Sequence, residues 1–483
     1  MQAGESWQAS WVRDNTGLEV QRTFSGGVTV RTERDCFGRE VRKSVQSGGI
    51  ERGAYRYQWG IANRLLSKEN ELTGTVTRYD YDRFDFLIRQ ETIQGSETDV
   101  IYRTPDFVGN LFETPDKKDR KYGAGGKLLE DPDCFYHYDD EGNLVFREFK
   151  QLQETGVRFD RKRMEKERGI RCLATGTGWL YEWASNGMLK KVIRPDGRPV
   201  EFRYDALGRR TAKQYFGKVT RWVWDGNVPI HEWDYKATDR QPDEEESTPL
   251  KEPIEDITTW VFEAGTFVPT AKIQEGKQYS IVSNYLGTPI QMYDEQGIKI
   301  WDCTMDVHGK ITTLVGNSEF DCPFRLTGQY FDSETNLCYN RFRYYSPETG
   351  SYLSQDPIRL AGNNPTLYAY VHDPNTWLDP LGLDELYALV ATKDGWYPIM
   401  KYGKKAPIGQ IYLKEGDLWK IGTSKNASNR YSKSYLQNTG QGVELKVLHT
   451  GLSDKTVKTL ERAKLKGHKA WKGYLPAGNK CCH

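Results

Sequence analysis

Aromatic and polar residues alternate at regular intervals along the first half of the chain. The alternation is strongest around nine aromatic anchors: Tyr57, Tyr81, Tyr102, Tyr122, Tyr138, Phe159, Trp183, Tyr204 and Trp224. Successive anchors are 16–24 residues apart, mostly 20 or 21. Alternation with period two places the rings on one face of a strand, and the Asp/Asn and Gly residues that follow favour a tight turn. Each unit therefore predicts a β-hairpin.

A single hairpin is marginally stable, so neighbouring hairpins are expected to pair edge to edge into a long curved sheet. An ordinary antiparallel sandwich is the alternative. Nine copies at nearly constant spacing favour the repeat array. The segment 236–256 interrupts the pattern with three prolines and the run Asp243-Glu244-Glu245-Glu246, and it predicts a solvated acidic loop.

The clearest copy of the repeat reads Phe202-Arg203-Tyr204-Asp205-Ala206-Leu207-Gly208-Arg209. It resembles the YD repeat of Rhs (rearrangement hotspot) proteins and of the related insecticidal toxin-complex subunits. The similar region covers about residues 20–310. The resemblance implies a mainly β spiral shell that encloses a C-terminal toxin. Because the repeats are too few to close a shell, the chain is expected to be a partial shell, either truncated or the distal end of a longer protein.

Composition agrees with many short strands. Aromatic residues make up 13% of the chain, with 29 Tyr and 14 Trp, and there are 46 Gly. No apolar run reaches the roughly 18–20 residues that span a bilayer, and the N-terminus lacks the pattern of a Sec signal. The eight cysteines are scattered without CxxC spacing, which predicts reduced thiols.

A more specific set of motifs occupies residues 324–383. It comprises 324–332, 339–345, 350–358, 367–370 and 374–383, and the last ends in Asp-Pro-Leu-Gly-Leu. These motifs are similar to the Rhs-associated core. The resemblance implies an intramolecular aspartyl protease that cuts the Leu383–Asp384 bond.

Two carboxylates that share one proton can activate water and polarise a carbonyl group. Asp356 and Asp379 lie in matching Asp-Pro motifs and are the predicted pair, with Asp373 as a weaker candidate. Arg359 stands where the family usually has Gly. The alternative interpretation is that the Asp-Pro pairs cap turns.

Charge divides the chain at the same bond. Residues 384–483 hold 18 Lys/Arg and 8 Asp/Glu, a net charge of +10, whereas the first 383 residues have 50 and 59, a net charge of −9. A basic module of this size suggests a polyanionic partner, and nucleic acid is the expected one.

Patterns in this module predict a small α/β domain. They indicate a hairpin of strands 409–414 and 418–422 around a turn at 415–417, and then a helix near 427–436. A strand over 443–450 and a helix over 454–466, capped by Ser453, follow.

Within this module, five features follow one another as in the GIY-YIG nuclease superfamily: Tyr412, Ile421-Gly422, Arg430, Glu461 and Asn479. Two positions depart from the family pattern. Gln410 replaces the first Gly and Lys420 replaces the second Tyr.

The resemblance implies phosphodiester cleavage. Glu461 binds one Mg²⁺, a cation that prefers carboxylate oxygen, and Tyr412 positions or deprotonates the attacking water. Arg430 clamps the phosphate, Lys420 assists electrostatically and Asn479 orients a neighbouring group. Surrounding lysines, among them Lys425 and Lys433, contact the backbone without reading sequence.

The sequence therefore predicts three parts: a shell segment (1–320), a self-cleaving core (321–383) and a toxin (384–483) whose catalytic part spans 408–480. The predicted function is that of a secreted antibacterial effector that releases a Mg²⁺-dependent nuclease, with DNA favoured as substrate. By resemblance, the effector is exported by type VI secretion with its spike components, acts in the target cytoplasm and is blocked by a cognate immunity protein. Two alternatives stay open: a non-catalytic recognition scaffold with a basic docking tail, and an RNase.

Overall fold

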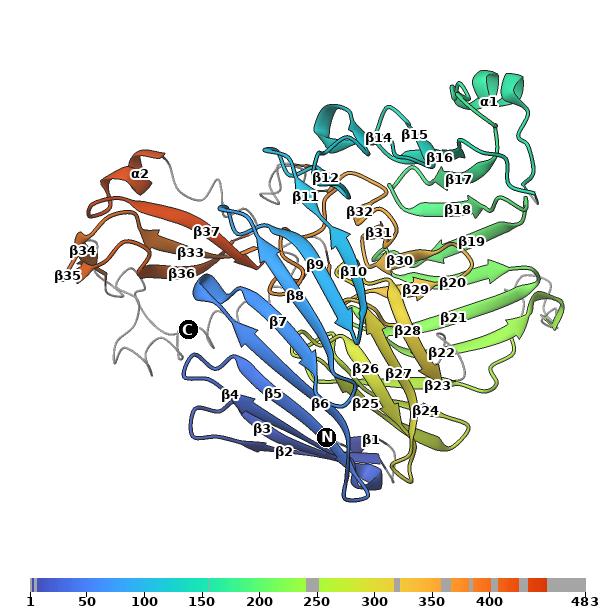
Figure 1. The fold of residues 1–483 in the computed structure, drawn as a ribbon. Helices are drawn as coiled ribbons and strands as arrows, with labels where there is room; N and C mark the ends of the chain where they lie inside the picture. Colours follow the sequence, from blue (N-terminus) through green and yellow to red (C-terminus); the bar gives the residue numbers. More distant parts are fainter. Residues whose placement is uncertain are drawn as a thin grey trace. The chain divides into compact units, whose positions relative to one another are not determined.

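The computed structural model describes residues 2–3, 7–154, 156–239, 252–316, 322–357, 366–381, 385–400, 407–424 and 433–449. The chain divides into two compact units, and each is described by itself. The first comprises residues 1–12, 19–355 and 366–376, and the second 13–18, 356–365 and 377–483. The first is mainly β, as predicted (Figure 1). The second, for which a small α/β domain is predicted, holds five strands and one helix among its described residues from 377 onward. Among the described residues, no helix is long and apolar enough to cross a membrane.

The chain begins with an antiparallel meander in which each strand pairs with the next. Ten strands of the described residues form this sheet: β1 (Gln2–Ala3), β2 (Trp7–Arg13), β3 (Glu19–Phe24), β4 (Thr29–Arg34), β5 (Glu40–Ser47), β6 (Ile50–Trp59), β7 (Leu65–Asn70), β8 (Thr75–Tyr81), β9 (Leu87–Gln94) and β10 (Glu97–Tyr102). Short 3-10 turns at Ser25–Gly27 and Ile61–Asn63 join some of them.

A small hairpin of β11 (Thr104–Pro105) and β12 (Leu111–Phe112) leads into a second, longer meander. Its described strands, again in sequence order, are β13 (Lys121–Tyr122), β14 (Leu128–Glu130), β15 (Cys134–Tyr138), β16 (Leu144–Phe149), β17 (Gly178–Trp183), β18 (Leu189–Ile193), β19 (Pro199–Tyr204), β20 (Arg210–Tyr215), β21 (Lys218–Asp225), β22 (Val228–Lys236), β23 (Thr258–Phe262), β24 (Pro269–Gln274), β25 (Lys277–Ser283), β26 (Pro289–Tyr293), β27 (Lys299–Met305) and β28 (Ile311–Gly316). Further 3-10 turns lie at Ala124–Gly126 and Ala237–Asp239.

Apart from Phe159, the aromatic anchors lie in alternate strands within each meander, which explains their spacing. Tyr81 and Tyr204 end β8 and β19, and Trp224 is the last residue but one of β21. At each of them the pairing register shifts by a β-bulge. A bulge bends the strand and redirects a side chain. The Tyr hydroxyl or Trp indole N–H of each anchor donates a hydrogen bond to the backbone carbonyl of the residue that begins the preceding strand. The pairs are Tyr81 to Leu65 (3.0 Å), Tyr204 to Leu189 (2.7 Å) and Trp224 to Arg210 (2.6 Å).

The residues after the anchor shape the turn. Asp205 accepts hydrogen bonds from the backbone N–H groups of Leu207 and Arg209, each at 2.9 Å, and Gly208 adopts a φ of 73°. That left-handed conformation is costly for residues with a Cβ atom. The side chain of Arg209 pairs with Asp205 and also reaches the carbonyl of Gly226 in the next hairpin. The Tyr-Asp-x-x-Gly-Arg string thus orders one turn and ties it to its neighbour.

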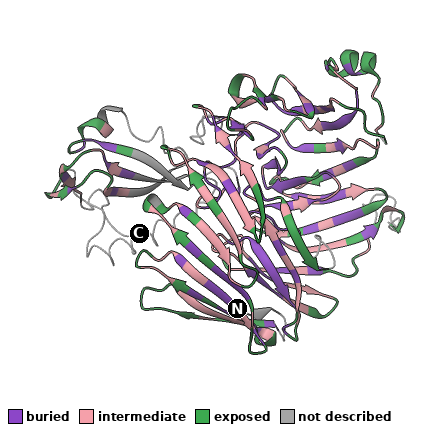
Figure 2. Ribbon diagram, in the orientation of Figure 1, coloured by how far each residue is buried: buried purple, intermediate pink, exposed green. Residues whose placement is uncertain are grey.

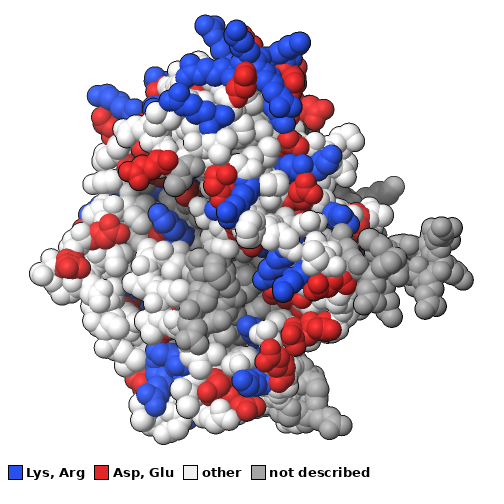
Figure 3. All heavy atoms as spheres, turned by 90° about the vertical axis from the view of Figure 1, so that its right-hand side faces the viewer, with Lys and Arg blue, Asp and Glu red and all other residues white. Residues whose placement is uncertain are grey.

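The predicted repeat at Phe159 is wrong. This residue lies in an insertion between β16 and β17, which pair directly with each other through Phe146 and Leu180. The insertion contains α1 (Arg161–Arg168), capped by Asp160 at its start and by left-handed Gly169 at its end. Met164 and Phe159 pack with Phe146. In Figure 3, a group of Lys and Arg side chains lies at the top of the view, where α1 lies.

The predicted acidic loop also falls between paired strands. β22 and β23 pair through His231 and Thr259, and the intervening residues 240–251 lie outside the described part of the chain.

Two clusters of buried side chains hold the first unit together. The first joins the two meanders, because Trp7, Val45 and Tyr57 pack with Ile290 and Tyr293. Figure 2 shows buried and exposed residues alternating along many of these strands, which is the pattern of a sheet with one covered face.

The second cluster forms where a four-stranded sheet covers the longer meander. Its strands are β29 (Tyr330–Asp332), β30 (Leu337–Asn340), β31 (Arg343–Ser346) and β32 (Ser351–Tyr352). Tyr339 and Tyr344 pack against Phe202 and Leu189 of the meander. The motifs at 324–352 are therefore part of the first unit and complete its core.

The second unit contains two small sheets and one described helix. β33 (Glu385–Ala391) is the central strand of the larger sheet, between β36 (Leu418–Ser424) and β37 (Val443–His449), and β34 (Gly395–Ile399) pairs with β35 (Gly409–Leu413). The helix α2 spans Lys433–Asn438.

Candidate active site

Tyr412 lies on β35, as the sequence predicts, and its side chain is 51% exposed. It is opposite Trp396 of β34, and the two rings meet edge to face with centroids 5.6 Å apart. The Tyr412 side chain is therefore supported by a neighbouring ring while it stays open to solvent. An exposed phenol on a paired strand is accessible to a ligand.

Lys420 lies on β36, and the predicted strand is confirmed with bounds Leu418–Ser424. The predicted hairpin of β35 with β36 is wrong: in the described residues β35 pairs with β34, and Lys420 is opposite Leu389 of β33. The turn between the two strands is present, because Asp417 N–H donates to Lys414 O at 2.9 Å. A local pattern shows the strands and the turn, whereas the strand that pairs with each is decided by distant residues.

The other predicted catalytic residues lie outside the described residues. These are Arg430, Glu461 and Asn479, together with the predicted DNA contact Lys425 and the helix at 454–466. Lys433 begins α2, so the helix expected near 427–436 is described from 433 onward. The strand expected over 443–450 is confirmed as β37 (Val443–His449).

A compact apolar core supports this unit. Leu389, Tyr397, Trp419 and Val443 are buried together, and Trp377 packs against them. The indole of Trp419 donates to Pro398 O at 2.9 Å, and the hydroxyl of Tyr397 donates to Gly442 O at 2.9 Å. Since Trp377 precedes the predicted cut bond, part of this core comes from the segment upstream of that bond.

Asp356 and Asp379 are both buried, with 9% and 5% exposure, and both belong to the second unit. The Leu383–Asp384 bond and Arg359 lie outside the described residues. Two carboxyl groups share a proton when they lie side by side, and the protease role of this pair stays a prediction.

Asp373 belongs to the first unit and has a structural environment. Its carboxylate accepts hydrogen bonds from the hydroxyl of Thr376 at 2.5 Å and from the backbone N–H of Asn375 at 3.0 Å. Burial raises its pKa above the usual value. These contacts describe a residue that caps a turn.

One polar network was missed by the sequence analysis. Buried Asp332 of β29 contacts Arg210 of β20 and also Lys213 Nζ at 3.1 Å, and Lys213 reaches Glu334 at 2.8 Å. Burial alone raises the pKa of Asp332, but the two cations hold it below its usual value. The only sequence signal for Asp332 is its place in the core motif 324–332, because its partners are more than a hundred residues away.

Comparisons with known proteins give separate matches for the N-terminal and C-terminal parts of the chain. Residues 19–372 match the family model of the teneurin YD-shell, and residues 400–473 match that of URI fold toxin 2. The URI fold is related to that of GIY-YIG nucleases. The two matches cover separate parts of the sequence, so shell and toxin are distinct elements of one chain.

Curated relatives carry the names of toxins. The chain is 27% identical to the probable deoxyribonuclease RhsA of Dickeya dadantii over 88% of its own length and 28% of that protein. It is 30% identical to the double-stranded DNA deaminase toxin A of Burkholderia cenocepacia (80% and 26%) and 26% identical to toxin protein Tse5 of Pseudomonas aeruginosa (79% and 33%). The chain thus spans about a quarter to a third of the length of these relatives.

The YD-shell match extends over well more than half of the chain, and the two meanders described above lie almost entirely within it. The chain belongs to the teneurin YD-shell family, and its C-terminal part matches the family model of URI fold toxin 2.

Proposed function

We propose that the URI-fold domain is a nuclease that cleaves phosphodiester bonds of DNA with the help of Mg²⁺. The match of residues 400–473 to a URI-fold toxin carries this proposal. The name of the relative RhsA, a probable deoxyribonuclease, and the net charge of +10 over residues 384–483 favour DNA.

Each side chain has a role in this reaction. The exposed phenol of Tyr412 orients or deprotonates the water, and Arg430 and Lys420 neutralise charge that develops on the phosphate. Glu461 would hold the Mg²⁺, and the ion would supply a Lewis acid to the scissile phosphate. Asn479 orients a neighbouring group, and Lys425 and Lys433 contact the DNA backbone.

Plasmid nicking by the purified full-length chain tests this function. The wild type is expected to convert supercoiled DNA to open circles with Mg²⁺ and to lose this activity with EDTA. Removing one group that stabilises the transition state costs on the order of 10²–10³ in rate, and we expect such losses for Glu461→Gln and Arg430→Lys.

Lys118→Gln is a matched control, because Lys118 is an exposed lysine of the first unit. Equal nicking by wild type and Glu461→Gln would refute the assignment. If a labelled RNA is cut and the plasmid is not, the substrate is RNA. A protein that binds DNA without cutting either substrate is a docking module.

We infer that the core releases this domain by cutting the Leu383–Asp384 bond with Asp356 and Asp379. Support comes from the resemblance of residues 324–383 to the Rhs-associated core and from the burial of both carboxyl groups in one unit. One carboxylate takes a proton from water while the other, protonated, donates to the scissile carbonyl.

Denaturing electrophoresis of the purified chain tests the cut. The wild type should yield a hundred-residue fragment that begins at Asp384, whereas Asp379→Asn and Asp356→Asn should each give one intact band. Asp373→Asn is the control and should still be cut, because its carboxylate caps a turn of the first unit. A fragment of the same size in all three variants would exclude these carboxylates as the catalytic pair.

We further propose that the chain is part of an antibacterial effector. It leaves the producer by type VI secretion together with spike components, acts in the cytoplasm of the target cell, and is neutralised in the producer by an immunity protein. The relative named toxin protein Tse5 supports the toxin role. In a competition assay, the producer should lose its advantage when its secretion sheath is deleted and keep it when an unrelated secretion system is deleted.

A further inference from the structure

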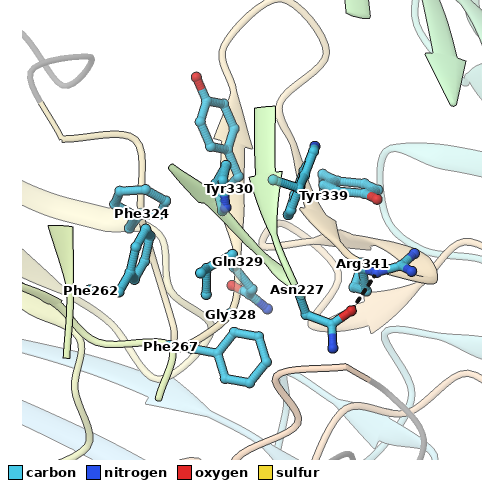
Figure 4. Close-up of a pocket in the computed structure, with 12 residues that line it drawn as sticks. Asn227, Phe262, Phe267, Phe324, Gly328, Gln329, Tyr330, Tyr339 and Arg341 are labelled. Atoms are coloured by element: carbon cyan, nitrogen blue, oxygen red, sulfur yellow. Dashed lines mark hydrogen bonds between the residues drawn. The ribbon is translucent and has the colours of Figure 1, made fainter. Parts of the chain in front are cut away.

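A small pocket lies in the first unit between Phe262, Phe267 and the carboxamide of Gln329 (Figure 4). Its volume is about 20 Å³, which is room for about one water molecule. Both polar atoms of the Gln329 side chain are closed off from solvent, so this pocket offers no site to a larger ligand. The second unit, in contrast, presents two aromatic rings that are open to solvent.

These rings belong to Trp396 and Tyr412, on the paired strands β34 and β35 (Figure 1). Trp396 is 55% exposed and Tyr412 is 51% exposed, and the two residues lie directly opposite each other. Single exposed apolar side chains are common on protein surfaces, whereas adjacent ones form a continuous apolar surface of the kind that binds a partner.

Alternation along both strands determines which way the rings face. Their sequence neighbours Tyr397 and Leu413 are 0% and 4% exposed and belong to the core of the unit. Because successive side chains of a strand point to opposite faces, Trp396 and Tyr412 project away from that core. The hydroxyl of Tyr397 donates to Gly442 O at 2.9 Å and fastens the strand from below. The rings therefore stand on a supported backbone.

The two rings meet edge to face, with 5.6 Å between their centroids and 82° between their planes. In this arrangement the ring that presents its edge keeps both of its faces uncovered by the other ring. A planar ligand can therefore stack on an uncovered face while the second ring bounds it from the side. Bases of single-stranded nucleic acid bind to aromatic side chains by stacking of this kind.

The face that carries the rings has no net charge. On one side it continues to Pro398 and Gln410, which lie opposite each other, and on the other it ends at exposed Asp394 and Lys414, one acid and one base. The surrounding module, residues 384–483, has a net charge of +10. Lysines elsewhere in the module suit the phosphate backbone, whereas a neutral aromatic surface suits the base.

We propose that Trp396 stacks on an unpaired base of the nucleic-acid substrate while Tyr412 bounds that base at its side, so that the adjoining phosphate comes to the Tyr412 hydroxyl. This role rests on the proposed nuclease function and adds the kind of substrate, which is DNA with an unpaired base. Bases inside a duplex are already stacked and must be extruded before a protein ring can cover them. Trp396 precedes residues 400–473, so it lies outside the part that matches the toxin family.

Binding of a short, labelled single strand of DNA to the full-length chain tests this role by fluorescence anisotropy. EDTA is present, so that the titration does not depend on cleavage. Trp396→Ala should weaken binding by about tenfold, because stacking on an aromatic side chain contributes that much per base. Trp396→Phe keeps a ring and should retain most of the affinity. Neither substitution should change the affinity for a blunt duplex.

A strand of the same length that lacks all bases is the matched ligand, and the wild type and Trp396→Ala should bind it equally. The control Phe107→Ala removes a ring of the first unit that is 98% exposed, and it should bind the single strand as the wild type does.

Three outcomes overturn the proposal: equal affinity of the wild type and Trp396→Ala for the single strand, an equal loss on the strand without bases, or a wild-type dimer that Trp396→Ala separates. The last outcome would assign the rings to a second copy of the chain. If the plasmid is not nicked but Trp396→Ala shows the expected loss, the nuclease function is wrong and the stacking role stands. If the plasmid is nicked and the affinity is unchanged, the stacking role alone is wrong.

Discussion

One carboxylate, that of Asp205, holds the turn after Tyr204 in shape. Asp205 accepts two backbone hydrogen bonds and pairs with Arg209 Nε at 2.7 Å. Replacing it by Ala removes all three contacts. We expect a loss of about 1–2 kcal/mol in the free energy of unfolding, because hydrogen bonds to charged groups are strong but this turn is partly exposed. Urea unfolding followed by tryptophan fluorescence measures the change.

Two further variants separate the contributions. Asp205→Asn keeps an oxygen acceptor and loses the charge, so it should cost less than Asp205→Ala. Asp225→Ala changes an exposed aspartate at the end of β21 and should leave the urea midpoint within the experimental scatter. Equal losses for Asp205→Ala and Asp225→Ala contradict the role assigned to the turn carboxylate.

At the scale of elements, a buried ion network fastens the four-stranded core sheet to the meander. Asp332 of β29 lies between Arg210 and Lys213 of β20. Replacing Asp332 by Asn leaves buried Arg210 without its carboxylate partner and Lys213 with Glu334 alone, and breaking a buried pair in this way costs about 3–5 kcal/mol. We expect a large drop in the urea midpoint and faster hydrogen exchange over 329–346.

The exposed pair of Lys118 with Asp116 provides the control for Asp332. Asp116→Asn should change the free energy of unfolding by no more than about 1 kcal/mol, because exposed ion pairs contribute little. Similar effects of the two substitutions would show that burial of the Asp332 network does not matter for stability.

The insertion between β16 and β17 depends on a single buried acid. Glu148 accepts hydrogen bonds from the backbone N–H groups of Leu173 (2.7 Å), Ala174 (2.8 Å) and Gly176 (2.9 Å), and it lies 3.1 Å from His137 Nε2. Burial opposes the charged form, but these donors lower the pKa of Glu148 from 4.5 to about 2. Its contribution is therefore complete above about pH 4.5 and is lost as the pH falls toward 2.

Glu148→Gln should accordingly lower stability at neutral pH and differ less from the wild type as the pH falls through this window. Hydrogen exchange of residues 171–176 reports the effect locally. Glu167→Gln removes an exposed partner of Arg163 on α1 and should leave that segment unchanged. A difference between wild type and Glu148→Gln that stays constant from pH 7 to pH 2 contradicts the mechanism.

These elements also show what the sequence could predict. The Tyr-Asp turn at Tyr204 and Asp205 was predictable, because its hydrogen bonds join residues a few positions apart. Phe159 imitates that pattern, but a following helix and Glu148 hold it outside the sheet. Strands β35 and β36 were found at nearly their observed bounds from local alternation, and Tyr412 and Lys420 with them.

Partners distant in sequence were not predictable from one sequence. Leu389 of β33 lies opposite Lys420, and no local signal marks β33 as the central strand. The pairing of Asp332 with Arg210 and the convergence of Gln329 with Phe262 and Phe267 depend on sheets that fold over each other. Contacts between residues close in sequence were predictable, whereas contacts that the fold brings together from distant segments were not.

On the scale of the whole first unit, the last segment of the core (366–376) ties both meanders together. Buried Arg103, which follows β10, donates to the carbonyls of Val371 (2.5 Å) and His372 (2.8 Å). In the longer meander, the Tyr285 hydroxyl donates to Asn375 O at 2.8 Å. This segment immediately precedes the residues of the second unit, so its order determines how firmly the unit's C-terminal end is held.

Arg103→Met leaves both carbonyls without their charged donor, and we expect hydrogen exchange over 366–376 to accelerate by at least tenfold, the equivalent of one lost strong hydrogen bond.

Lowering the pH should also accelerate hydrogen exchange over 366–376 in the wild type. Burial, with Arg103 nearby, lowers the pKa of His372 from 6.5 to about 4. The unfolded segment therefore binds a proton that the folded one refuses, and stability is lost as the pH falls from about 6.5 toward 4. The control Arg83→Met changes an exposed arginine and should leave the hydrogen exchange of 366–376 at the wild-type rate. Equal exchange of this segment in the wild type, Arg103→Met and Arg83→Met would show that Arg103 does not hold it.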